Sequence, residues 1–161
     1  PAQPASLRVR VPEGTSVTFE DLIHGTQRVP LAQQQPNFII KRKDQFWAYQ
    51  LAAACDDGFG DISHVIRGSD LLDSTFRQIF LQQTLGLTTP HYGHLPLVYG
   101  ADGHKLSKQT GAAAVDDADP INTLLAAAHV LGLAPPAESH ASSAHILAWC
   151  VEHWDYRRVP R

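Results

Sequence analysis

The sequence predicts an α/β fold followed by a smaller helical region. Residues 61–70 are typical of a strand that ends in a glycine turn, and a helix with one apolar face follows, ending at Gly86. Strand, turn and helix in this order are the unit of an α/β layer. Alternating apolar residues predict further strands near the amino terminus, and apolar residues at helical spacing predict helices beyond residue 111.

The amino-terminal region predicts short strands. Apolar and polar residues alternate over residues 7–11 and again over residues 17–19, with Pro-Glu-Gly between them. This pattern predicts either a β-hairpin or two short strands. Residues 38–40 predict another short strand, and a polar turn follows at residues 43–44.

A short helix is predicted next from the alanine and leucine content of AYQLAAAC, ending at Asp56-Asp57-Gly58. In the following strand we expect His64, Val65 and Ile66 to form a buried centre. Thr75, with Gln78 three residues later, predicts a capping box at the start of the next helix. Residues 94–99, HLPLVY, predict one more strand.

The carboxyl-terminal region differs in character. Residues 112–118 are small and polar, which is typical of a hinge, and Asp119-Pro120 predicts a helix start with an N-cap and a proline in the first turn. Gly132 is expected to end that helix, and a last helix is predicted around Ile146 and Cys150. We therefore predict a division into residues 1–111 and residues 112–161.

Composition limits the possible classes of protein. The chain has 161 residues, of which 43% are hydrophobic and 18% charged, enough for one compact unit with or without an appendage. Its formal net charge of −3 argues against a surface wrapped in nucleic acid but leaves room for a local contact patch. Because no long apolar segment occurs, we expect no membrane contact and a cytoplasmic location. We also expect a monomer. Cys55 and Cys150 are expected to be buried thiols.

The stretch GHKLSKQTG, residues 103–111, places two lysines around a serine. A phosphate-binding P-loop is excluded, because Gly100 and Gly103 are too close together and His104 separates glycine from lysine. Lys105 and Lys108 can instead close over a polyphosphate and neutralise charge as pyrophosphate leaves. A solvated lysine turn is the alternative.

Several segments carry a resemblance to a known family. KLSKQ resembles the lysine-serine-lysine signature of class I aminoacyl-tRNA synthetases, which binds ATP and stabilises the transition state of amino-acid activation. Five ordered segments over roughly residues 7–111 resemble the second half of the glutamyl-tRNA synthetase catalytic domain. They are RVRVPEG, FEDLIHG, NFIIKRKDQFWAYQLA, DDGFGDISHVIRGSDLLDSTFRQIFLQQTLGL and HLPLVYGADGHKLSK. The resemblance implies a Rossmann-like class I catalytic domain, represented by its second half.

Within that family the sequence is more similar to the short paralogues, the glutamyl-Q tRNA(Asp) synthetases. The resemblance implies that glutamate is activated with ATP and Mg²⁺ and attached to the queuosine base in the anticodon of tRNA(Asp). We expect only a short helical tail after Lys108 and no large anticodon-binding region, and the signature ends in Gln109 where longer enzymes commonly have arginine.

The resemblance also implies site residues. Tyr49 and Arg67 fall at glutamate-binding positions, and a guanidinium can bind a carboxylate bidentately while a tyrosine hydroxyl orients the amino acid. A core tyrosine and a surface ion pair are the structural alternatives. Asp70 falls at the acidic position near the adenosine ribose, although Asp73 is an equally good helix cap nearby.

For the phosphates of ATP, Lys108 is the first choice, and Lys105 and Ser107 are secondary. The tetrapeptide HYGH, His91 to His94, spells the other class I signature, histidine-x-glycine-histidine. In the family that motif opens a helix far upstream of the lysine loop, whereas here it is expected to precede a strand, so we interpret it as coincidence.

Part of the family's domain has no counterpart here. The genuine histidine signature and the zinc-binding insertion with its cysteines do not occur in these 161 residues, so the ligands for the family's zinc lie outside this chain. We therefore expect that the 161 residues alone do not form glutamyl-adenylate.

Other functions remain to be weighed. A metal hydrolase lacks support because no H-E-x-x-H spacing occurs, and a serine hydrolase lacks G-x-S-x-G. A fragment of an ordinary glutamyl-tRNA synthetase and a non-catalytic tRNA-binding remnant are the remaining alternatives.

Overall fold

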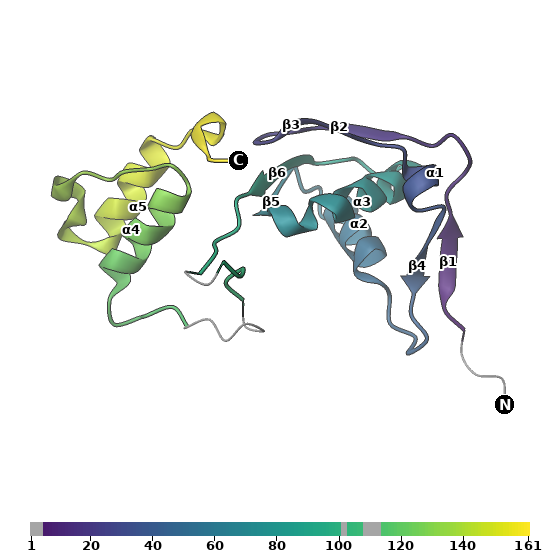
Figure 1. Ribbon diagram of the computed structural model, residues 1–161, viewed down its shortest axis with the longest axis horizontal. Coiled ribbons are helices and arrows are strands. Elements are labelled where there is room, and N and C mark those ends of the chain that lie inside the picture. Colours follow the sequence, from purple (N-terminus) through teal and green to yellow (C-terminus); the bar gives the residue numbers. More distant parts are fainter. Residues whose placement is uncertain (1–4, 101–102, 108–113) are drawn as a thin grey trace. The chain divides into compact units, whose positions relative to one another are not determined.

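The computed structural model describes residues 5–100, 103–107 and 114–161, and it divides the chain into two compact units (Figure 1). The first unit spans Pro1–His94 and the second Leu95–Arg161, and each is described by itself. The boundary predicted at residue 111 lies outside the described residues, so that division stays a prediction.

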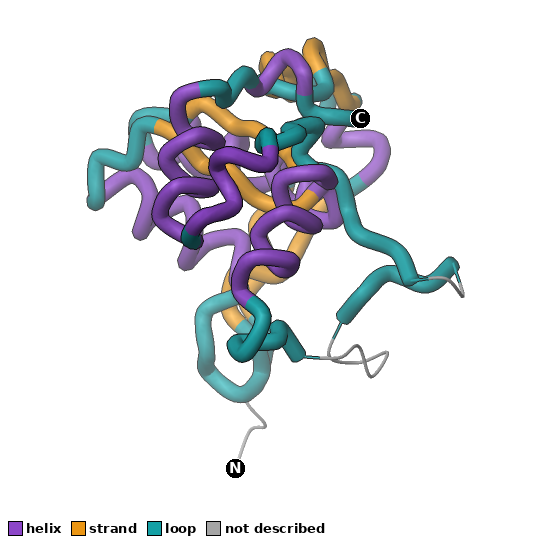
Figure 2. Tube along the Cα trace, turned by 90° about the vertical axis from the view of Figure 1, so that its left-hand side faces the viewer, coloured by secondary structure: helices purple, strands orange, loops and turns teal. Residues whose placement is uncertain are grey.

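The first unit has α/β architecture, in which three strands come first along the trace and helices and strands follow in turn (Figures 1 and 2). Its elements are β1 (Leu7–Arg10), β2 (Val17–Asp21), β3 (Gly25–Val29), α1 (Leu31–Gln34), β4 (Asn37–Lys41), α2 (Tyr49–Phe59), β5 (His64–Gly68), a 3₁₀ turn (Ser69–Leu71), α3 (Leu72–Leu85) and β6 (His91–Leu95), which reaches the unit boundary. The strands form a four-stranded sheet of order β3-β2-β6-β5 and a separate β1-β4 pair.

Strand pairing corrects one of the sequence alternatives. β1 pairs antiparallel with β4, and β2 pairs antiparallel with β3, so residues 7–11 and 17–19 form two short strands and no hairpin with each other. The backbone N–H of Val11 donates to Pro36 O at 2.9 Å, which holds the end of β1 on the β4 side. β2 also pairs in parallel with β6 through Asp21 and Tyr92, so the end of β2 lies beside β6.

Helix α2 runs past its predicted end. It continues through Asp56-Asp57-Gly58 to Phe59, and the N–H of Gly60 donates to Asp56 O at 2.9 Å. Gly58 serves packing here, because a Cβ on it would lie 2.9 Å from Leu87 Cδ1. The prediction that Gly58 ends the helix is therefore wrong. The absence of a side chain at this position instead lets α2 approach Leu87 closely.

The predicted capping box of α3 is wrong. The helix begins at Leu72, and its N-cap residue Leu71 makes no side-chain capping bond. Thr75 and Gln78 lie inside the helix with their side chains fully buried, where they bind the side chain of Arg67. The predicted end is confirmed, because Gly86 has a φ of 69°, the left-handed conformation that glycine adopts freely.

Two strand predictions also need correction. β5 is an edge strand: His64 is exposed, Ile66 is 50% exposed, and only Val65 packs, half-buried, against the core, so the predicted buried centre of three residues is wrong. The last strand covers residues 91–95, not 94–99. It stops before Pro96, which has no N–H to continue the ladder.

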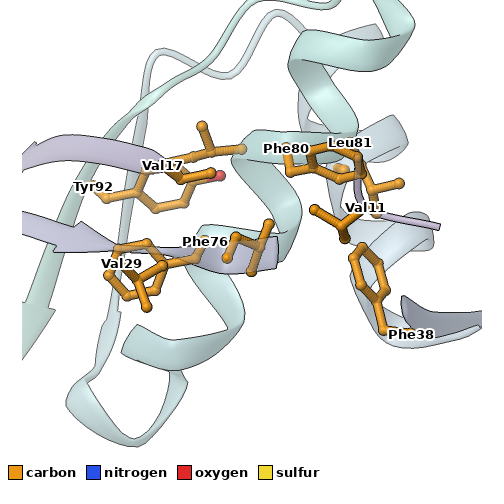
Figure 3. Close-up of a cluster of buried hydrophobic side chains, with 11 residues drawn as sticks. Val11, Val17, Val29, Phe38, Phe76, Phe80, Leu81 and Tyr92 are labelled. Carbon is orange, nitrogen blue, oxygen red and sulfur yellow. The ribbon is translucent and has the colours of Figure 1, made fainter. Parts of the chain in front are cut away.

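The core of the first unit lies between α3 and the strands, and its side chains interdigitate in Figure 3. Phe19 from β2 meets Phe76 from α3 edge to face, with ring centroids 5.3 Å apart. The buried apolar residues are Val11, Val17, Val29, Leu31, Phe38, Ala54, Phe76, Ile79, Phe80, Leu81 and Tyr92.

The second unit is built around two helices that lie side by side, α4 (Pro120–Val130) and α5 (Ser143–Glu152) (Figure 1). Asp119 caps α4 by accepting from Asn122 N, as predicted. Short 3₁₀ turns occur at Ala137–Ala141 and Tyr156–Arg158. Among the described residues, no helix has the length and apolar character needed to cross a membrane.

Candidate functional site

Arg67 is the centre of a polar cluster in the first unit. It lies one residue before the end of β5, half-buried, and its guanidinium is bound from two sides. Nη2 donates to Thr75 Oγ1 at 2.6 Å and to Gln78 Oε1 at 2.7 Å, both on α3. Nε donates to Nε2 of His94, on β6, at 3.3 Å.

Two tyrosines complete the surroundings of the guanidinium. Nη1 of Arg67 donates to the hydroxyl of Tyr49 at 3.3 Å, and the guanidinium carbon lies 5.2 Å from the ring centroid of Tyr92. Tyr49 is the first residue of α2 and is 50% exposed, so its hydroxyl is open to a ligand. The structure thus brings together the two residues that the sequence predicts to bind glutamate.

The partners on α3 were missed by the sequence analysis. Thr75, Gln78 and Gln82 are spaced three and four residues apart, which puts them on one face of the helix. All three are fully buried, and Gln82 Nε2 donates to the hydroxyl of Tyr92 at 3.1 Å. A polar stripe at helical spacing between apolar residues was the available signal, and interpreting Thr75 and Gln78 as a cap concealed it.

The hydrogen bonds limit how Arg67 can bind an anion. Nε–H, both Nη2–H groups and one Nη1–H are engaged, which leaves the other Nη1–H within the described part of the chain. A bidentate fork made by the guanidinium alone is therefore not available. Because the Tyr49 hydroxyl accepts from Nη1, its own proton is directed elsewhere, so one N–H and one O–H can together hold a carboxylate.

Behind Arg67 lies a buried Asp-His pair. Nδ1 of His94 lies 2.6 Å from Oδ2 of Asp21, and both side chains are fully buried. The other oxygen of Asp21 accepts from the backbone N–H groups of Ile23 and His24 at 3.0 and 2.9 Å. The carboxylate is thereby held at the end of β2, and it in turn holds the imidazole.

The environment shifts the pKa of several groups at the site. Burial alone would raise the pKa of Asp21, but the hydrogen bonds from the His24 backbone and the His94 side chain outweigh it and lower the pKa below 3.8. Burial lowers the pKa of His94 below 6.5, against the opposing hydrogen bond and charge of Asp21. Burial raises the pKa of Asp57, which Arg67 partly offsets.

The residues predicted to contact ATP are placed less completely. Lys108 lies outside the described residues. Lys105 pairs with Tyr99 in an isolated antiparallel bridge of the second unit, and Ser107 is half-buried. Asp70 is exposed, in the 3₁₀ turn directly after β5. Since the lysine stretch and Arg67 belong to different units, their joint role stays a prediction.

The HYGH tetrapeptide forms part of β6, so the expectation that it precedes a strand was wrong, because the strand starts at His91 itself. His91 is exposed and lies against His64, with ring centroids 5.0 Å apart. His94 is fully buried, and both its ring nitrogens contact protein groups. His94 is therefore not available to an adenine.

No group of three or more His, Cys, Asp or Glu side chains in the described ranges could hold a metal ion. The site residues therefore offer no ligand set of their own for Mg²⁺ or zinc, and we derive no step through a protein-bound metal.

Comparison with protein families identifies the fold and its lineage. Residues 1–144 match the family described as tRNA synthetases class I (E and Q), catalytic domain. The chain belongs to this family. The resemblance seen in the ordered segments of the sequence is thereby confirmed, as is the α/β class I synthetase fold.

The curated class I synthetases that this chain resembles are named glutamyl-Q tRNA(Asp) synthetase. Those of Burkholderia cenocepacia, Burkholderia mallei and Xanthomonas campestris are 54%, 51% and 46% identical over 96%, 95% and 97% of the chain. The chain spans about half the length of these relatives, between 52% and 53%.

Solved class I synthetase structures share the fold. A glutamate tRNA ligase from Elizabethkingia meningosepticum, crystallised in complex with its amino acid, superposes with a TM-score of 0.74 at 23% identity. A glutamate-tRNA synthetase from Elizabethkingia anophelis gives 0.73 at 22% identity. Each alignment covers 97% of this chain and 35% of the other.

Proposed function

We propose that this chain is the part of a glutamyl-Q tRNA(Asp) synthetase that binds glutamate and contacts ATP. The cluster of Arg67 and Tyr49 carries the proposal, because it offers a cation and a hydroxyl side by side on a half-exposed edge. About half of the aligned residues are identical to those of relatives with that name, which supports the assignment of glutamate over other carboxylates.

In the proposed reaction, a carboxylate oxygen of glutamate attacks the α-phosphorus of ATP. The bond from that phosphorus to the bridging oxygen breaks, pyrophosphate leaves, and glutamyl-adenylate forms. A hydroxyl of the queuosine base in tRNA(Asp) then attacks the acyl carbon, and AMP leaves. The reaction would take place in the cytoplasm, with Mg²⁺ accompanying ATP as part of the substrate.

The residues take distinct roles in this proposal. Nη1–H of Arg67 and the hydroxyl of Tyr49 hold one carboxylate of glutamate, which orients the other toward ATP. Lys108, with Lys105 and Ser107, neutralises the phosphates as negative charge moves onto the leaving pyrophosphate. Asp70 accepts hydrogen bonds from the ribose.

The test uses the full-length protein that contains this sequence. Labelled glutamate, ATP and queuosine-containing tRNA(Asp) are incubated together, and the labelled tRNA is cleaved into anticodon and 3′-terminal fragments. The proposal requires the label in the anticodon fragment, and no label when the tRNA lacks queuosine. Label in the 3′-terminal fragment would instead identify an ordinary glutamyl-tRNA synthetase.

A second measurement addresses the non-catalytic alternative. Equilibrium binding of ATP and of glutamate to the same protein should saturate, whereas a tRNA-binding remnant would bind tRNA without either site. For the 161 residues alone we expect no glutamate-dependent exchange of pyrophosphate into ATP, and detectable exchange would contradict that expectation.

A further inference from the structure

We propose that Asp21 and His94 act as a positioning pair for Arg67, with His94 working as a neutral imidazole that accepts a hydrogen bond from the guanidinium. Neither residue touches the substrate in this role. The proposal rests on the proposed function for the identity of the bound carboxylate, but the pair itself is defined by contacts within the first unit.

The contacts determine the tautomer of His94. A guanidinium has donors and no acceptor, so the Nε2 atom that faces Arg67 Nε at 3.3 Å must carry a lone pair. The proton of the neutral ring then lies on Nδ1 and is donated to Asp21 Oδ2 at 2.6 Å. The hydroxyl of Thr75, 3.0 Å from Nε2, accepts from Arg67 and can donate to the same lone pair.

This arrangement aims the guanidinium. Among its buried partners, Thr75 and Gln78 hold only Nη2, and the Tyr49 hydroxyl that accepts from Nη1 belongs to a side chain that is 50% exposed. The bond from Nε to His94 adds a second anchor and fixes the plane of the guanidinium. With the plane fixed, the remaining Nη1–H stays beside the hydroxyl of Tyr49 and both donors serve one anion.

The burial of the pair argues for this role. Asp21 and His94 are 3% and 0% exposed, and a buried ionised group is costly unless its partners compensate. An apolar pair could fill the same space without that cost. The compensation is present on the Asp21 side in four N–H donors, the backbone N–H groups of Ile23, His24 and His94 and the His94 ring. The compensation of Asp21 does not explain why Nε2 of His94 presents a hydrogen-bond acceptor to Arg67, and the positioning role does.

Burial and the charge of Arg67 favour the neutral form of His94, and the Asp21 carboxylate opposes them. β2 contributes the carboxylate of Asp21, β5 the guanidinium of Arg67 and β6 the phenol of Tyr92, whose ring stacks on the imidazole at 6.2 Å. His24 adds a repulsive interaction with a protonated ring, whereas α3 presents the uncharged hydroxyl of Thr75. Protonation would place an N–H against the guanidinium, so glutamate binding should weaken as pH falls.

Two substitutions separate positioning from packing. In His94→Gln the side-chain amide oxygen can occupy the place of Nε2 and accept from Arg67, while the bond to Asp21 is lost. In His94→Asn the amide nitrogen can occupy the place of Nδ1 and donate to Asp21, while the acceptor for Arg67 is lost. Each variant thus keeps one half of the pair, and each serves as the control for the other.

The full-length protein is assayed for glutamate-dependent pyrophosphate exchange. We expect His94→Asn to raise the KM for glutamate about tenfold or more, with the KM for ATP unchanged, because a hydrogen bond to a charged group is lost. His94→Gln should stay within about threefold of the wild type. An equal rise in both variants, or a larger rise in His94→Gln, would overturn the proposal.

A measurement on the wild type decides the case if the variants do not fold. Nitrogen NMR of the His94 ring at neutral pH should show a protonated Nδ1 and an unprotonated Nε2. A proton on Nε2 would overturn the proposal. This measurement requires no turnover, so an enzyme that fails to transfer glutamate would refute the proposed function while the NMR result still judged the Asp21–His94 pair.

Discussion

The two units begin their helices in different ways. In the second unit, α4 starts at a side-chain cap from Asp119 and α5 at one from Ser142, as short-range sequence patterns favour. In the first unit, α3 has no side-chain cap, although Asp73, Ser74 and Thr75 stand at its start. Thr75 is used to bind Arg67 instead.

This difference separates local from long-range control of structure. The groove between α4 and α5 is lined mainly by apolar side chains such as Leu124 and Ile146, so polar groups in that unit are free to cap helices. The first unit buries Thr75, Gln78 and His94 around one arginine. A polar residue at a helix start therefore has a predictable role only where no buried charge competes for it.

The largest expected effect tests the arginine itself. Arg67→Lys keeps the charge but loses the planar fork that lets one side chain donate to α3, β6 and Tyr49 together. We expect kcat/KM for glutamate to fall about 100-fold or more, since several hydrogen bonds to a charged group are lost. Steady-state pyrophosphate exchange measures it, with the exposed Arg28→Lys as the matched control. Near-normal glutamate kinetics in Arg67→Lys would remove the centre of the proposed site.

The next effect tests the buried stripe of α3. Gln78→Leu removes an acceptor from Arg67 and a donor to Gln50, and it should lower the free energy of unfolding by about 1–3 kcal/mol. Gln83→Leu, on the exposed side of the same helix, should change it by less than about 0.5 kcal/mol. Urea denaturation of both variants gives the comparison. Equal losses of unfolding free energy in the two variants would mean that the buried side chain of Gln78 stabilises the protein no more than an exposed glutamine does.

The pH dependence of stability sharpens the contrast further. The pKa of His94 is about 6.5 in the unfolded chain and lower in the folded protein, so the unfolded state binds more protons between these two pKa values. The contribution of His94 to the free energy of unfolding is therefore complete above about pH 6.5 and is lost as pH falls below it. One proton limits the slope to about 1.4 kcal/mol per pH unit. Asp21, with its pKa below 3.8, adds a second loss below that pH.

The control for this pH profile is His94→Gln, which should lack the upper phase and keep the lower one. The raised pKa of Asp57 acts with the opposite sign just above pH 3.8, so it cannot produce the upper phase. Denaturation at a series of pH values measures both phases. A wild-type profile that stays flat between pH 6.5 and the acid transition would contradict the buried neutral histidine.

The smallest effect belongs to the second unit. Asp119→Ala removes the cap of α4 and should cost about 1 kcal/mol of stability. The neighbouring Asp117→Ala, at an exposed position before the cap, should cost less than about 0.5 kcal/mol. Chemical denaturation followed by circular dichroism distinguishes them. If both cost the same, the local cap does not determine where α4 starts.

Much of the fold was accessible from the sequence. The strand at Asn37–Lys41, the strand around Arg67, the end of α3 at Gly86 and both carboxyl-terminal helices follow from alternation, glycine and capping residues. Tyr49 and Arg67 were identified through resemblance to the family. The β3 strand was missed although its partner β2 is adjacent in the chain, because GTQRV offers no alternation of large apolar residues. The pairing of β1 with β4 was missed because strand partners far apart in sequence leave no local trace.

The sequence by itself determined the family and a few local boundaries, such as the start of α4 at Asp119 and the end of α3 at Gly86, because those signals act within a few residues. The tertiary structure decided what surrounds Arg67. Asp21 and His94 are 73 residues apart in the chain, and no periodicity links them. They meet because β2 and β6 are neighbours in the sheet, and burial then makes their hydrogen bonds to each other and to the guanidinium obligatory.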